Sequence, residues 1–161
     1  MGVRTLHDFD AQRARGESGE GVLDRFFEAR GHLIQQATRG QQLNGIDRVF
    51  VRDGKVAYVE YKTDYRAHET GHVFVETISV DTDDTAGWAY TSGADFLVYY
   101  IPALKKIMVM PLETLRKLLP GWARAYPTRP AQNREYATHG ILVPLAEFEA
   151  HATQVFTTSA V

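Results

Sequence analysis

Two runs rich in apolar residues with high β-propensity, 46–52 and 55–63, stand on either side of an Asp-Gly dipeptide. Runs of this kind are typical of β-strands, and a two-residue Asp-Gly linker is the strongest short-range signal of a β-hairpin. A two-residue turn also fixes which residues face each other across the pair. Counted back from the turn, the register places Asp47 opposite Glu60.

A helical pattern precedes the hairpin. One apolar stripe of a helix is formed by Val22, Leu23, Phe26 and Phe27. Ser18 is a suitable N-cap and Gly31 a suitable C-terminal residue, so the sequence predicts a helix over residues 19–30. Glu20 lies on the apolar side of this helix, where a carboxylate would point toward whatever the helix covers.

The rest of the chain predicts an α+β fold. Further strands are expected over 72–80, 95–101, 106–110 and 140–144, and further helices over 83–92, 112–119 and 145–152. Pro120-Gly121 is expected to end the second of these helices. Residues 38–45 and 122–136 are expected to be loops, and the tail from Thr153 is expected to fray. The order of elements predicts a central mixed sheet flanked by helices in one domain, with a core over about 17–119 and a C-terminal extension over 120–161.

Composition narrows the class of function. The 161 residues are 44% hydrophobic, which is typical of a globular domain. The 18 basic and 20 acidic residues give a net charge of −2, so net charge gives no support to non-specific binding of polyanions. The absence of cysteine excludes thiolate zinc sites and cysteine nucleophiles. We see no signal peptide and no apolar run of about 18 residues, and we therefore expect a cytoplasmic protein without a membrane partner.

The hairpin carries a charged cluster at one end. Lys62 lies two residues after Glu60 and therefore projects from the same face as Glu60 and the facing Asp47. The rest of this face is apolar (Val49, Val51, Val56 and Tyr58), and we expect it to be buried under the first helix, which would bring Glu20 to the cluster. Two facing carboxylates repel each other, and a bound divalent cation would turn that repulsion into coordination.

Each charged residue also has an ordinary explanation. Glu-x-Lys pairs are common on solvated strands, Asp47 is suited to capping a strand, and Glu20 is suited to the first turn of a helix. The joint register of Asp47, Glu60 and Lys62 is what favours a functional site over three separate surface charges.

These residues resemble the motif of the PD-(D/E)XK nuclease superfamily. The family has an aspartate on one strand, (Asp or Glu)-x-Lys on the next and often a glutamate on the preceding helix, which correspond here to Asp47, Glu60-Tyr61-Lys62 and Glu20. The resemblance covers residues 17–110, and the helical glutamate is similar to that of archaeal Holliday-junction resolvases and small phage or plasmid nucleases. Ile46 stands where the family name has proline, as in many members.

The resemblance implies a restriction-endonuclease-like αβββαβ core and a metal-dependent endonuclease that hydrolyses DNA. The implied catalytic residues are Glu20, Asp47, Glu60 and Lys62. Mg²⁺ or Mn²⁺ would be held by Asp47, Glu60, the backbone carbonyl of Tyr61 and Glu20, with Glu76 as a further candidate that more readily pairs with a cation or a loop. The alternative is a catalytically idle nuclease fold that serves in nucleic-acid binding or assembly.

The contacts with DNA and with other chains are less defined by the sequence. Residues in two polar loops, Arg39, Gln42, Asn44, Tyr65 and Arg66, are candidates for binding the DNA backbone or stacking on bases, and two solvated loops are an equally good interpretation. A homodimer is also expected, because many members of the family cut two strands with two sites and the apolar strand over 106–110 would need covering at a sheet edge.

Overall fold

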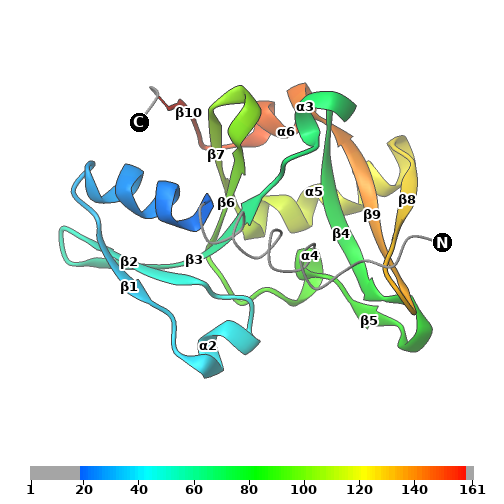
Figure 1. Ribbon diagram of the computed structural model, residues 1–161, viewed down its shortest axis with the longest axis horizontal. Helices are drawn as coiled ribbons and strands as arrows, with labels where there is room; N and C mark the ends of the chain where they lie inside the picture. Colours follow the sequence, from blue (N-terminus) through cyan, green and yellow to red (C-terminus); the bar gives the residue numbers. More distant parts are fainter. Residues whose placement is uncertain (1–18, 159–161) are drawn as a thin grey trace.

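The computed structural model describes residues 19–158, which form two β-sheets with helices packed around them (Figure 1). The larger sheet has the strand order β1-β2-β3-β6-β7-β10, and the smaller has the order β5-β4-β9-β8. The larger sheet consists of β1 (Leu33–Gln36), β2 (Arg48–Arg52), β3 (Lys55–Thr63), β6 (Phe96–Ile101), β7 (Lys106–Pro111) and β10 (Gln154–Thr157). The smaller consists of β4 (His72–Val80), β5 (Thr85–Ala86), β8 (Thr128–Gln132) and β9 (Ala137–Pro144).

The helices lie between and around these strands. They are a first helix over residues 19–28, α2 (Arg39–Leu43), α3 (Ala67–Thr70), α4 (Trp88–Thr91), α5 (Leu112–Ala125) and α6 (Leu145–His151), with 3-10 turns η1 (Asp81–Asp83) and η2 (Pro102–Leu104). The β3–β6 pair is parallel, whereas the other neighbours in the larger sheet are antiparallel. The predicted α+β fold with a central mixed sheet flanked by helices is therefore confirmed.

The Asp-Gly hairpin forms as the sequence predicts. Its two turn residues have φ values of 50° and 74°, and positive φ at both positions is what a type I′ turn requires. The predicted register holds as far as Arg48 opposite Val59. Because β2 begins at Arg48, the ladder ends one pair before the expected match of Asp47 with Glu60.

The first helix covers the opposite face of the hairpin from the one we expected. Its Leu23 and Phe27 pack with Phe50, Val59 and Tyr61 in one core, together with residues of β6 and β7. The expected face is partly open, since Val56 and Tyr58 on β3 are 56% and 37% exposed. Both faces carry apolar residues in the sequence, so their spacing alone does not decide which face a helix covers.

A second core lies on the other side of the large sheet, where Figure 1 shows α5 and the smaller sheet. It joins Leu97 and Met110 of the large sheet to Leu115 of α5 and to Val75 and Ile141 of the small sheet. The large sheet is therefore buried on both sides in its centre. Glu60 and Lys62 belong to this second side, since they align with Leu97 and Tyr99 of β6.

Several expected elements differ in the structure. The strand over 72–80 belongs to the smaller sheet, where it pairs with β9 and β5, and it does not continue the hairpin as a third strand. The region 83–92 is helical only at α4, and the expected loop 122–136 contains the end of α5 and all of β8. The expected loop 38–45 contains α2, whose Thr38 and Gln41 form a capping box that the sequence already showed.

The predictions for the end of α5 and for the C-terminal tail were also wrong. Helix α5 runs through Pro120, because the buried Leu119 and Trp122 continue its apolar side and packing outweighs one lost backbone hydrogen bond. The tail from Thr153 forms β10, which pairs with β7. β7 is therefore covered by its own chain, and the edge argument for a homodimer does not hold. In the described part of the chain, no helix is long and apolar enough to cross a membrane.

Candidate active site

Glu60 and Lys62 lie on one face of β3 at the end that approaches α4. Alternation along the strand turns both side chains toward the second core, and Glu60 is only 4% exposed. The Lys62 ammonium lies 3.1 Å from Glu60 Oε1 and 5.8 Å from the centre of the Trp88 ring. The carboxylate of the pair is thus buried, whereas the lysine is half-exposed.

The second carboxylate oxygen of Glu60 is incompletely satisfied. Its Oε2 is buried and has no hydrogen-bond partner within residues 19–158. Burial raises the pKa of Glu60, the nearby Lys62 and Ser92 lower it, and the charge of Asp47 makes a smaller contribution that raises it. The Ser92 hydroxyl itself donates to the Gly45 carbonyl at 3.2 Å, which leaves Oε2 of Glu60 without a donor. A buried carboxylate oxygen without a donor is costly, and a bound cation would remove that cost.

Asp47 lies directly before β2 and is fixed by the backbone of the next strand. Its amide donates to the Val59 carbonyl at 2.9 Å, and its Oδ2 accepts a 2.7 Å hydrogen bond from the Tyr61 amide. The carboxylate therefore lies beside Glu60-Tyr61-Lys62, although not by the regular pairing that the sequence predicted. Its second oxygen, Oδ1, is in no hydrogen bond found among the described residues.

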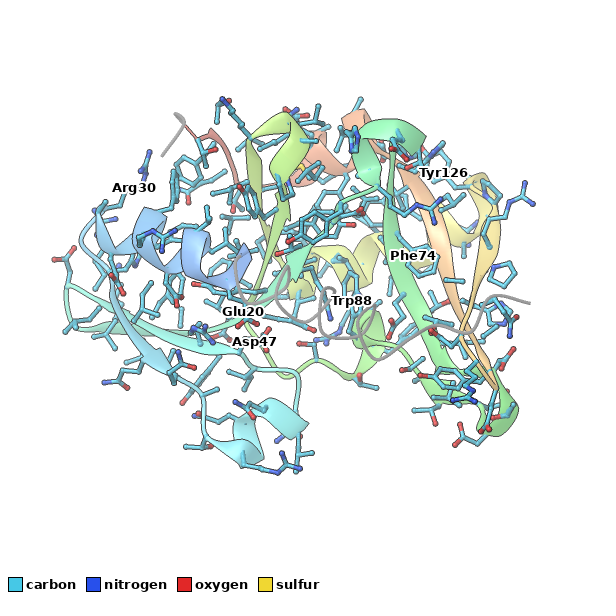
Figure 2. All side chains as sticks on the ribbon, viewed as in Figure 1. Glu20, Arg30, Asp47, Phe74, Trp88 and Tyr126 are labelled. Carbon is cyan, nitrogen blue, oxygen red and sulfur yellow. The ribbon has the colours of Figure 1, made fainter. Side chains whose placement is uncertain are left out.

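Glu20 reaches the same region from the other side of the sheet. The first helix begins against the end of β3, where a Cβ on Gly19 would lie 2.9 Å from Thr63 Cγ2. Burial raises the pKa of Glu20; Arg48 opposes the rise, and Asp47 adds to it. Figure 2 shows Glu20 and Asp47 next to each other where the helix meets the hairpin. The expected cap Ser18 lies outside the described residues.

Arg48, the first residue of β2, binds the first helix and was not predicted as a site residue. It is 6% exposed, and its guanidinium donates to Asp24 at 3.0 Å, to Glu20 at 3.3 Å and to the Asp47 carbonyl at 2.9 Å. The Tyr61 hydroxyl donates to the same Asp24 at 2.9 Å. The sequence signal was the spacing of Glu20 and Asp24, which puts two carboxylates on one side of a helix.

The residues present fit a hard divalent cation only in part. Within residues 19–158, no three His, Asp or Glu side chains are arranged closely enough to hold a metal. Mg²⁺, however, commonly takes one or two carboxylates and keeps several waters. Asp47 and the unsatisfied Glu60 are such a pair, and the Tyr61 carbonyl directly follows Glu60 in the sequence. Glu20 forms an ion pair with Arg48 and is therefore a less available ligand than Asp47 and Glu60.

The other predicted residues are spread around the cluster. Glu76 lies in the smaller sheet and accepts a 3.3 Å hydrogen bond from the Trp88 amide at the start of α4, which is the loop-binding role that we preferred for it. Arg39, Gln42 and Asn44 are exposed on or beside α2, and Tyr65 and Arg66 are exposed before α3. Figure 1 places α2 at the lower edge and α3 at the upper edge, with β3 between them.

Comparison with known proteins gives one informative result. No family model matches the chain, and no curated protein matches it. Among solved structures, it is similar to a bacterial homing endonuclease, I-Ssp6803I, with a TM-score of 0.53 and 16% sequence identity. The match covers 81% of this chain and 77% of that one. The chain therefore shares its fold with this endonuclease over most of the length of both.

Proposed function

We propose that this protein is a Mg²⁺- or Mn²⁺-dependent nuclease of the PD-(D/E)XK type that hydrolyses phosphodiester bonds of DNA, as an endonuclease. The observation that carries the proposal is the buried Oε2 of Glu60, which has no donor in the described chain and lies in the field of Asp47 beside Lys62. A purely structural carboxylate at this depth would be expected to have both oxygens satisfied. The fold shared with a homing endonuclease supports the same conclusion.

Each residue has a distinct role in this proposal. Asp47 and Glu60 would hold the ion, with the Tyr61 carbonyl as a further ligand and Glu20 at the margin, as a ligand or through a bound water. When bound, the ion lowers the pKa of a water and neutralises charge on the phosphate. Lys62 is half-exposed beside Glu60, where its ammonium would orient the attacking water or stabilise the negative charge that develops on the phosphate.

DNA would approach the open side of the cluster. The exposed residues of α2 (Arg39, Gln42, Asn44) and of the turn before α3 (Tyr65, Arg66) are candidates for contacts with the phosphate backbone. Since α2 and the turn before α3 lie at two edges of the molecule, one DNA strand that contacts both would pass over the end of β3. Because the net charge is −2, such binding would depend on local rather than overall charge.

The test is a panel of labelled substrates, namely duplex, junction, flap and single-stranded DNA and an RNA strand, incubated with Mg²⁺, Mn²⁺ or EDTA. The wild type should cut at least one DNA when a metal is present, and EDTA should abolish the cut. Lys62→Ala should lower the rate by roughly 100-fold or more, since it removes one charge from the transition state. The matched control is Lys117→Ala on α5, whose ammonium is exposed and pairs only with Glu113 among the described residues.

The second candidate function is a nuclease fold that binds nucleic acid without cutting it. It is favoured by the ion pair that engages Glu20 with Arg48 and by the lack of three converging metal ligands in residues 19–158. Calorimetric titration with Mn²⁺ separates the two candidates. Stoichiometric binding that Glu60→Gln removes supports the nuclease, whereas DNA binding with neither Mn²⁺ binding nor cleavage supports the idle fold.

A further inference from the structure

A closed ring of hydrogen bonds lies behind the candidate site, on the face of the sheet that the first helix covers. Asp24 accepts from Arg48, whose guanidinium also donates to the Asp47 carbonyl. The Asp47 carboxylate accepts from the Tyr61 amide, and the Tyr61 hydroxyl returns to Asp24. Each of the four residues therefore contacts two others in the ring, and a shift of one of them disturbs the rest.

Arg48 joins two backbone segments in this ring, the first helix and the chain at the start of β2. Its fork contacts the first helix at Asp24 and Glu20 and the chain before β2 at Asp47. The planar guanidinium holds such partners at fixed relative angles. Because Arg48 is buried, its positive charge is stable only beside these carboxylates. We infer that the same contacts fix the angle between the first helix and the hairpin.

Tyr61 transmits this arrangement to the other face of the sheet. It is the middle residue of Glu60-Tyr61-Lys62, and its side chain points toward the helix while its neighbours point toward α4. The pKa of its hydroxyl is raised by burial and by the charge of Asp24, so it stays a protonated donor to that carboxylate. A strand that is anchored from behind at Tyr61 has little freedom to rotate Glu60 and Lys62.

We propose that Asp24 is a positioning residue of the metal site, acting through Arg48 on Asp47 and Glu20 and through the Tyr61 hydroxyl on Glu60 and Lys62. The inference rests on the proposed function, because it assumes that Asp47 and Glu60 hold the ion. Asp24 itself lies on the first helix, and its partners are Arg48 and Tyr61. In this proposal it contacts neither the ion nor the substrate. Partners of metal ligands typically change metal affinity by 10- to 100-fold when they are removed.

Asp24→Asn tests the proposal with a side chain of the same shape. The amide keeps one acceptor oxygen but loses the charge that Arg48 and Tyr61 share, so Mn²⁺ should bind roughly 10-fold more weakly by calorimetry. At saturating Mn²⁺, kcat should fall while KM for DNA changes little, because the substrate contacts are untouched. Tyr61→Phe removes only the hydroxyl from the ring and should weaken Mn²⁺ binding in the same direction by a smaller factor.

Asp81→Asn is the matched control. Asp81 is also a carboxylate that accepts a backbone hydrogen bond, from the Ala137 amide at 2.9 Å, and that contacts the imidazole of His139 at 3.1 Å. It lies in the 3-10 turn η1, which connects β4 and β5 of the smaller sheet. Its loss should lower the melting temperature without changing the Kd for Mn²⁺, which separates general destabilisation from positioning.

The outcomes distinguish this inference from the proposed function. If the wild type binds no Mn²⁺ and cuts no DNA, the proposed function itself is wrong. If the wild type binds Mn²⁺ and folded Asp24→Asn binds it equally well, Asp24 is structural and the inference is overturned. Should Asp24→Asn fail to fold, Tyr61→Phe decides: weaker Mn²⁺ binding supports the ring, and unchanged binding overturns it.

Discussion

Asp24 on the first helix and Glu60 on β3 are two partly or fully buried carboxylates at opposite faces of the hairpin, and their surroundings differ sharply. Asp24 accepts from the Arg48 guanidinium and the Tyr61 hydroxyl, so both of its oxygens have donors. Glu60 has one ammonium at 3.1 Å, and its buried Oε2 has no donor in residues 19–158. The Asp24 carboxylate is therefore fully satisfied, whereas the Glu60 carboxylate keeps one buried oxygen that a ligand could satisfy.

The difference separates two uses of buried charge. A satisfied network fixes geometry, since breaking any bond leaves an unpaired group in a medium of low dielectric. An unsatisfied carboxylate makes the empty site less stable and raises its affinity for a cation. We infer that the helix-covered face holds the hairpin in place and that the opposite face carries the chemistry. Four predictions test this comparison, in order of decreasing expected effect.

Glu60→Gln should have the largest effect on activity. It keeps the shape of the side chain and removes the charge, so cleavage of the best DNA substrate should fall about 1,000-fold, or about 4 kcal/mol in the activation barrier. The melting temperature measured in EDTA should stay equal or rise, because a desolvated charge is removed. Glu113→Gln, at an exposed position on α5, is the control. Undiminished cleavage by Glu60→Gln would refute the assignment of the open face.

Arg48→Met should have the largest effect on stability. It removes the cation of the closed face and leaves Asp24 and Glu20 as neighbouring charges, which costs about 3 kcal/mol in the free energy of unfolding. We take the lower end of the usual range because Glu20 is 38% exposed and water screens part of the effect. Urea unfolding in EDTA measures the change, with the exposed Arg52→Met as control. A loss as small as that of the control would mean that the ring contributes no stability.

Asp47 takes part in the hydrogen-bond ring and is also a proposed metal ligand, and two substitutions separate these roles. Asp47→Ala leaves the Tyr61 amide without its acceptor and should cost about 1–3 kcal/mol in the free energy of unfolding. Asp47→Asn retains an oxygen that can accept this bond, so its cost should be smaller. Both should abolish Mn²⁺ binding in calorimetry. Retention of Mn²⁺ binding by Asp47→Asn would place the ion elsewhere.

The pH dependence should show the smallest effect. In the unfolded chain, Glu60 titrates near its usual pKa of about 4.3, and burial raises that pKa in the folded protein. Between the two values the folded state binds more protons, so the stability of the metal-free protein should fall as pH rises through this window. Glu20 contributes a slope of the same sign. The stability gained by Glu60→Gln should therefore be near zero below pH 4 and reach a plateau above the folded pKa; a gain that does not change with pH would contradict the raised pKa.

The sequence by itself determined the hairpin, the first helix and the α+β class. The hairpin followed because an Asp-Gly turn with positive φ fixes the register locally, as confirmed as far as Arg48 and Val59. The pairing of Glu60 with Lys62 on one face followed from the two-residue period of a strand. These are local properties, and each depends on residues that are close along the chain.

The tertiary structure decided what lies on each face. Val56 and Tyr58 are as apolar as Phe50 and Val59, and only the packing of the first helix determined which pair is buried. The same packing buried Arg48, whose alternation alone suggests a solvated side chain. Contacts between distant segments also carried α5 through Pro120, added β10 to β7 and placed β4 in a second sheet. Burial and partner choice depend on which surfaces meet in three dimensions, and these non-local energies outweigh the local preferences that the sequence displays.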